Sequence, residues 1–77
     1  MNQPEETPSE ARLLVSRARR LRQLAEKTWQ NYNRACHKNN TERARMLLLD
    51  YKALDEGATH LLDKGLSLAK TNGEVIV

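Results

Sequence analysis

The residues best suited to covalent chemistry are Cys36 and the adjacent His37. A Cys–His catalytic pair needs an enclosing pocket and a third group that orients the base, whereas a metal site needs three or four ligands. The only other histidine is His60, and Cys36 is the only cysteine. We therefore expect no enzyme activity, no metal and no cofactor, and we interpret Cys36 as a small apolar residue near a helix end.

Basic residues gather in the first half of the chain. Residues 11–45 hold ten Lys or Arg and two acids, whereas the whole chain has a net charge of +3. The densest cluster consists of Arg12, Arg17, Arg19, Arg20 and Arg22. Such cations can follow nucleic-acid phosphates, but no helix-turn-helix spacing or zinc-finger pattern accompanies them. The pattern favours a solvated face or contact with an acidic protein partner over nucleic acid.

The length and composition predict one small domain that needs a partner. The chain has 77 residues, of which 39% are hydrophobic and none is phenylalanine, which is too little apolar mass for a two-layer enzyme with a sheltered cleft. A core of this size rarely supplies more than about 3–5 kcal/mol, and a single cysteine excludes an internal disulfide. The acidic start and the lack of a long apolar run predict no signal peptide and no membrane span, and therefore a cytoplasmic protein.

Two apolar seams with heptad-type spacing predict two helices. The first seam consists of Leu14, Ala18, Leu21, Ala25, Thr28, Tyr32 and Ala35. The second consists of Ala44, Leu47, Tyr51, Leu54, Ala58, Leu61, Gly65 and Leu68. A short polar connection between two helices of equal length predicts an all-α, coiled-coil-like antiparallel hairpin, with helices over 8–38 and 41–71 and a turn over 38–41.

Capping residues predict where the first helix begins. Thr7 is interpreted as the N-cap, Pro8 as the first helical residue and Glu10 as the acid that completes a capping box. The polar residues 1–7 are expected to form a disordered lead.

The turn and the end of the second helix also have cap signals. Asn39, followed three residues later by Glu42, is a candidate N-cap for the second helix. Gly73 follows Asn72 and predicts a left-handed stop. The hairpin is therefore expected to span 8–72, followed by a flexible tail over 73–77.

Large apolar residues outside the seams predict a contact surface. The seam of the first helix is flanked by Leu13 and Leu24 on one edge and by Val15 and Trp29 on the other. Met46 and Leu49 extend the apolar surface to the outer side of the second helix. Because only another chain can bury such residues in a two-helix protein, we expect Leu13, Leu24, Trp29, Met46 and Leu49 to bind a partner chain or a second copy.

The chain resembles the YscE-like co-chaperones of bacterial type III secretion. The resemblance covers about residues 14–70 and is strongest at Lys52-Ala53-Leu54-Asp55, followed by Ala58 and Leu61-Leu62, with the turn at Lys38–Thr41 at a similar distance before them. It implies a non-catalytic binding protein. Members of the family pair with a tetratricopeptide-like chaperone, and the pair keeps the needle subunit from polymerising in the cytoplasm.

Two other functions fit the same hairpin. One is a homodimeric four-helix bundle of phage or plasmid type that binds nucleic acid through the arginine-rich helix. The other is a small inhibitor of a host protein, which the sequence does not distinguish from a co-chaperone.

Overall fold

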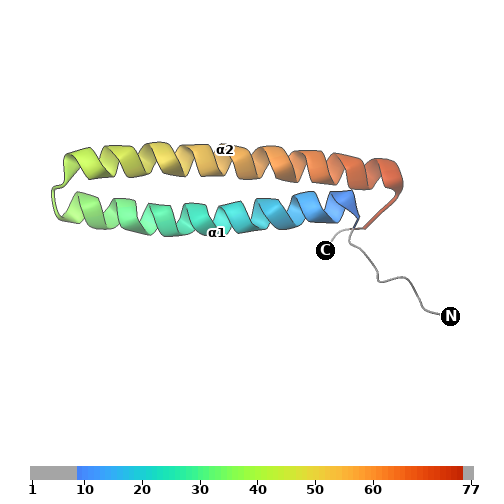
Figure 1. Cartoon of the computed structure of the whole chain (residues 1–77), viewed down its shortest axis with the longest axis horizontal. Helices are drawn as coiled ribbons and strands as arrows, with labels where there is room; N and C mark the ends of the chain where they lie inside the picture. Colours follow the sequence, from blue (N-terminus) through green and yellow to red (C-terminus); the bar gives the residue numbers. More distant parts are fainter. Residues whose placement is uncertain (1–8, 76–77) are drawn as a thin grey trace.

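The computed structural model describes residues 9–75, which form two long helices side by side (Figure 1). Helix α1 spans Glu10–His37 and helix α2 spans Thr41–Asn72. They run antiparallel, which confirms the predicted all-α hairpin. The radius of gyration is 17.1 Å, against about 11 Å for a compact globular chain of this length. The hairpin is a rod that exposes most of its residues.

Helix α1 begins two residues later than the capping pattern predicted. Ser9 is the N-cap, with an extended backbone, and its Oγ accepts a hydrogen bond from the Arg12 amide at 3.2 Å. The serine hydroxyl provides the cap that was assigned to the threonine hydroxyl, so the helix starts at Glu10. Thr7 and Pro8, and with them the predicted disordered lead, lie outside the described residues.

The turn uses its two asparagines for different purposes. Asn39 adopts a left-handed conformation with φ 57°, which asparagine tolerates better than most residues. This conformation reverses the chain, and Asn40 then caps α2 by accepting a hydrogen bond from the Arg43 amide at 3.2 Å. The assignment of the cap to Asn39 was therefore wrong by one residue.

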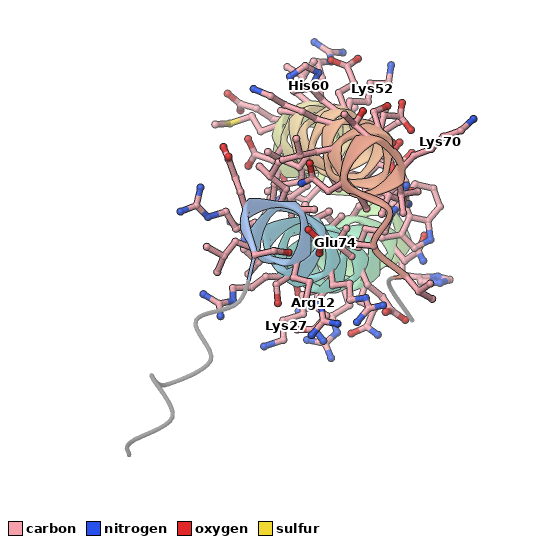
Figure 2. The ribbon with its side chains drawn as sticks, turned by 90° about the vertical axis from the view of Figure 1, so that its right-hand side faces the viewer. Arg12, Lys27, Lys52, His60, Lys70 and Glu74 are labelled. Atoms are coloured by element: carbon pink, nitrogen blue, oxygen red, sulfur yellow. The ribbon has the colours of Figure 1, made fainter. Side chains whose placement is uncertain are left out.

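Helix α2 ends at a left-handed glycine, as its sequence predicted. Gly73 has φ 69°, and the amide of Glu74 donates to the Ala69 carbonyl at 2.8 Å. The Glu74 carboxylate then accepts a hydrogen bond from the Ser9 hydroxyl at 2.6 Å, and Glu74 lies between the ends of the two helices in Figure 2. The start of the predicted flexible tail is thus bound to the N-cap of α1, whereas residues 76–77 lie outside the described part.

Small residues form most of the interface between the helices. Every residue of the two predicted seams is buried or partly buried. The buried hydrophobic residues are Ala11, Leu14, Val15, Ala18, Ala25, Ala35, Ala44, Ala58 and Ala69. Val15 was predicted at the edge of the seam but is only 3% exposed. It is buried because Gly65 faces it without a side chain, and a Cβ there would lie 2.9 Å from Val15 Cγ2.

Candidate protein-interaction surfaces

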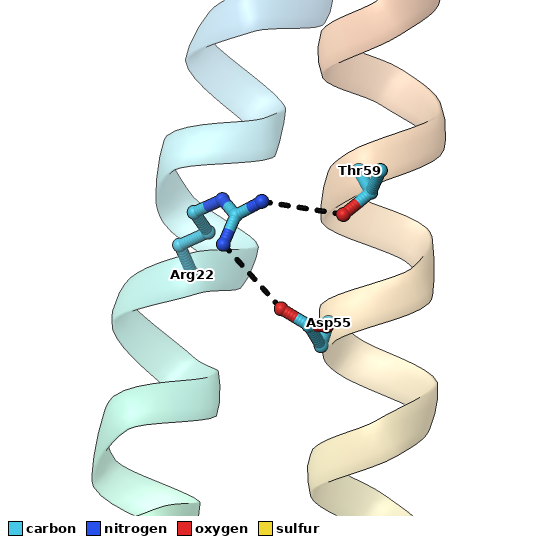
Figure 3. A network of polar contacts seen from close by, with 3 residues as sticks. All are labelled: Arg22, Asp55 and Thr59. Atoms are coloured by element: carbon cyan, nitrogen blue, oxygen red, sulfur yellow. Dashed lines mark hydrogen bonds and ion pairs between the residues drawn. The ribbon is translucent and has the colours of Figure 1, made fainter.

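A polar bridge between the helices identifies one long face of the hairpin. The guanidinium of Arg22 donates to Asp55 Oδ1 at 3.4 Å and to Thr59 Oγ1 at 3.2 Å (Figure 3). Trp29 lies two turns farther along α1 on the same side as Arg22. We call this side the aromatic face; it comprises Arg22, Trp29, Tyr51, Asp55 and Thr59.

Three aromatic rings pack together across the two helices. The Trp29 ring stacks on Tyr32 at 5.1 Å between centroids and contacts Tyr51 of α2 at 5.0 Å with a tilt of 49°. Trp29 nevertheless remains 40% exposed. A shallow hollow of about 290 Å³ lies beside it, lined by Arg22, Ala25, Glu26, Trp29, Tyr51 and Asp55. The ring therefore contacts both helices and remains partly open to solvent.

Cys36 lies beside the aromatic cluster, near the turn. It is a free, exposed thiol and, with Tyr32, lines a second hollow of about 360 Å³. A hydrogen bond with the Cys36 thiol, its charge and slight burial together raise the pKa of the Tyr32 phenol above its ordinary value of 10.0. Within residues 9–75, no three His, Cys, Asp or Glu side chains come close enough together to hold a metal ion.

The opposite long face of the hairpin is rich in leucine. Arg22 of α1 contacts Asp55 and Thr59 of α2, so these flanks of the two helices meet on the aromatic face. The opposite flanks of α1 and α2 therefore meet on the other long side of the rod. On α1 these residues are Leu13, Arg17, Arg20 and Leu24, and on α2 they are Met46, Asp50, Leu54, Gly57, Leu61, Lys64 and Leu68. Each set follows helical spacing. We call this set of residues the leucine face.

The five apolar residues predicted to bind a partner are all exposed, but they do not form one patch. Leu13, Leu24 and Met46 are 43%, 48% and 63% exposed and belong to the leucine face. Trp29 belongs to the aromatic face. Leu49 is 63% exposed and points away from α1, since it lies about 180° around α2 from the buried Ala58 at 100° per residue. The sequence predicted the exposure of each residue and the two edges of α1 on which Leu13, Leu24 and Trp29 lie, but not which flank of α2 meets each edge.

Two further large apolar side chains are exposed and were missed. Leu66 is 47% exposed and Val75 is 77% exposed. Leu66 directly follows Gly65 of the seam and, at about 100° per residue, lies on its flank, so its position in the heptad pattern was an available signal. Val75 lies in the predicted flexible tail over 73–77, which implies an exposed side chain, but it was not named as a contact residue.

The five arginines of the predicted basic patch lie on three sides. Arg22 bridges to α2 on the aromatic face, and Arg17 and Arg20 belong to the leucine face. Arg12 and Arg19 lie on the outer side of α1, and Figure 2 shows Arg12 and Lys27 pointing away from α2. Lys27 and Arg34 follow Arg20 at spacings of seven residues, on the same side of α1, a signal that was missed.

The comparisons with known proteins provide no family for this chain. No protein-family model, curated protein or solved structure matches it. Neither of the two described helices is long and apolar enough to cross a membrane.

Proposed function

We propose that the chain is a non-catalytic protein-interaction module, a small cytoplasmic co-chaperone or adaptor. The observation that carries this proposal is the contrast between its core and its surface. Most of the buried residues between the helices are alanines, whereas within residues 9–75 seven large apolar residues are 40% or more exposed, among them the five predicted contact residues Leu13, Leu24, Trp29, Met46 and Leu49. A partner that buries apolar surface gains about 25 cal/mol per Å² and stabilises the folded hairpin by mass action.

The resemblance to YscE-like co-chaperones makes the proposal more specific. The partner is then a tetratricopeptide-like chaperone, and the complex keeps a needle subunit of type III secretion from polymerising. The supporting features are the two matched helices, the short turn and the apolar side chains on more than one side of the rod. A concave groove between helical repeats suits such a rod, because it contacts several sides together.

A truncation at Leu49 tests the proposed contact. The tagged chain is captured from its native cells, and a Leu49→Ala variant is captured in parallel. We expect the variant to bind its partner about tenfold more weakly, since truncating an interface anchor costs on the order of 1–2 kcal/mol. Helix content, measured by circular dichroism, should stay nearly unchanged, because Leu49 makes little contact with α1.

Lys52→Ala is the matched control, because Lys52 also points away from α1 (Figure 2). It should leave capture unchanged. If the wild-type chain and Leu49→Ala capture equal amounts of the partner, Leu49 is not part of the interface. If only a dimer of the chain is recovered, with no second protein, the adaptor proposal is wrong and the chain is a homo-oligomer.

Nucleic-acid binding is the second candidate, and one observation favours it: the row of Arg20, Lys27 and Arg34 at seven-residue spacings along α1. The same capture distinguishes it by ultraviolet absorbance. Nucleic acid that is recovered with the chain and released by moderate salt would favour this function, since phosphate contacts weaken steeply with salt. An inhibitor of a host protein would instead appear as a stoichiometric enzyme partner.

A further inference from the structure

The leucine face carries an apolar strip along the rod, between α1 and α2, which we call the trough. Leu13 and Leu24 are nearly half exposed on α1, and Leu54, Leu61 and Leu68 are partly buried on α2. From Leu68 at the open end to Met46 near the turn, the trough runs about 33 Å at 1.5 Å per residue. It is long enough to hold a partner helix of about 20 residues.

The middle of the trough is lowered by a glycine. Gly57 is partly buried on the leucine face of α2, and a Cβ at this position would meet only Leu21 Cδ1, at 3.5 Å. Nearer the turn, a hollow of about 350 Å³ continues the face, lined by Asn40, Glu42, Arg43, Met46, Leu47 and Asp50. A strip between two helices that lacks a side chain at its centre suits the rounded surface of a third helix better than a flat surface.

The charges along this trough are mostly positive. Arg17 and Arg20 lie between Leu13 and Leu24 on α1, and Lys64 lies between Leu61 and Leu68 on α2. Arg43 adds a cation near the turn. The acids that face the trough are Asp50 and Glu42, both near the turn, and Glu10, at the open end. The half of the trough towards the open end therefore combines leucines with cations.

We propose that the leucine face binds an amphipathic helix of a partner protein whose apolar stripe is flanked by Asp and Glu. This inference rests on the proposed interaction function and names the chemistry of the partner. Its leucines would pack between α1 and α2 as the third helix of a bundle, and its acids would lie beside Arg17, Arg20 and Lys64. Complementary charge fixes the orientation and the preference for this partner.

A second copy of the chain fits this face less well. Paired in parallel, two copies would bring Arg17, Arg20 and Lys64 of each chain together; paired antiparallel, each copy would offer mainly one acid at that level, Asp50, against the three cations. Like charges across an interface select against a partner. The acidic helix therefore matches the trough better than self-association does.

Two synthetic peptides test the proposal on the full chain. Both are about 20 residues long, with the same leucine stripe and no tryptophan; one has glutamates beside the stripe and the other has lysines. Binding is followed by nuclear magnetic resonance of the isotope-labelled chain. We expect the acidic peptide to bind at least about tenfold more tightly and to shift the amides of Leu13, Leu24 and Gly57. Equal binding of the two peptides would overturn the proposal.

A charge reversal supplies the specific variant. The double variant Arg17→Glu with Arg20→Glu should reverse the preference between the peptides. The matched control, Arg12→Glu with Arg19→Glu, makes the same change of charge on α1 away from the leucine face and should leave the preference unchanged; Figure 2 shows Arg12 pointing away from α2. A preference that the control also abolishes would mean that net charge, not the leucine face, decides binding.

Further outcomes separate this inference from the proposed function. Amide shifts confined to other faces, or displacement of the peptide by a duplex oligonucleotide or by anionic lipid vesicles, would overturn the acidic-helix assignment. If light scattering shows a dimer and Leu24→Glu dissociates it, the leucine face binds a second copy of the chain instead. If the peptides fail while Leu49→Ala still weakens capture of a native partner, the inference fails and the interaction function stands. If no partner is captured either, both fail.

Discussion

At the scale of single residues, the contact of Tyr32 with Cys36 predicts a measurable ionisation. The hydrogen bond with the thiol raises the pKa of Tyr32 above 10.0, because the bond favours the neutral phenol and the charged sulfur repels the phenolate. Replacing Cys36 by alanine should move this pKa back down towards its ordinary value. The change is followed by tyrosinate absorbance in a Tyr51→Phe background, which leaves Tyr32 as the only tyrosine.

The sign of the pH effect on stability follows from the raised pKa. The folded chain holds the Tyr32 proton more tightly than the unfolded chain does. The contribution of this proton to the free energy of unfolding is therefore complete below pH 10.0, the ordinary pKa. It is lost as the pH rises through the pKa of Tyr32 in the folded chain. Cys36→Ser keeps a hydrogen-bonding group at the same place and is the control, with a smaller change than alanine. An unchanged titration in Cys36→Ala would show that the thiol does not act on the phenol.

At the scale of the helices, two glycines of α2 predict opposite effects of the same substitution. A Cβ at Gly65 would lie 2.9 Å from Val15 Cγ2 and 3.1 Å from the Ala11 carbonyl oxygen, so Gly65→Ala should destabilise the hairpin by about 1–3 kcal/mol. At Gly57 the nearest atom would be 3.5 Å away, so Gly57→Ala should stabilise it by about 0.5–1 kcal/mol. Urea unfolding followed by circular dichroism measures both, and equal effects would contradict the close approach at Gly65.

The sequence predicted the helices well because the heptad seams carry a strong signal. Every seam residue is buried or partly buried, and the left-handed stop at Gly73 is where the sequence placed it. The caps differ by one or two residues, because neighbouring Ser, Thr and Asn side chains can each cap a helix. Val15 was misplaced because its burial depends on Gly65 of the other helix, which periodicity within α1 does not reveal.

The candidate surface was predicted less completely, for a physical reason. Helical phase predicted which large apolar residues are exposed, but their grouping depends on which flanks of two different helices meet. The bridge from Arg22 to Asp55 and Thr59 fixes that pairing, and its partners are more than 30 residues apart in the chain. The leucine face, with Arg17 and Arg20 on it, becomes visible only once this pairing is known.

At the scale of the whole molecule, the rod has little to stabilise it apart from its own helices. Its interface consists largely of alanines, and among the described residues no large side chain is fully buried. A chain of this length buries a smaller fraction of its surface than a larger domain does. The proposed partner would therefore stabilise the fold directly when it binds, so unfolding of the chain would also report binding.

This coupling predicts a large thermal shift on binding. At a free concentration of 100 times its Kd, the acidic peptide should stabilise the folded chain by about 2.7 kcal/mol. At about 4–8 °C per kcal/mol for a domain of this size, the unfolding midpoint should rise by about 10–20 °C. Trp29, the only tryptophan, contacts Tyr51 of the other helix, so its fluorescence reports separation of the helices without signal from the peptide.

The lysine peptide at the same concentration is the control and should raise the midpoint much less, because it saturates the trough poorly. An acidic peptide that binds yet leaves the midpoint unchanged must bind the unfolded chain equally well, and would contradict recognition of the folded leucine face. A midpoint that rises with the concentration of the chain alone would show that a second copy supplies the stabilisation. In that case a second copy of the hairpin buries the leucine face, and the charges along the trough determine how the two identical chains are oriented.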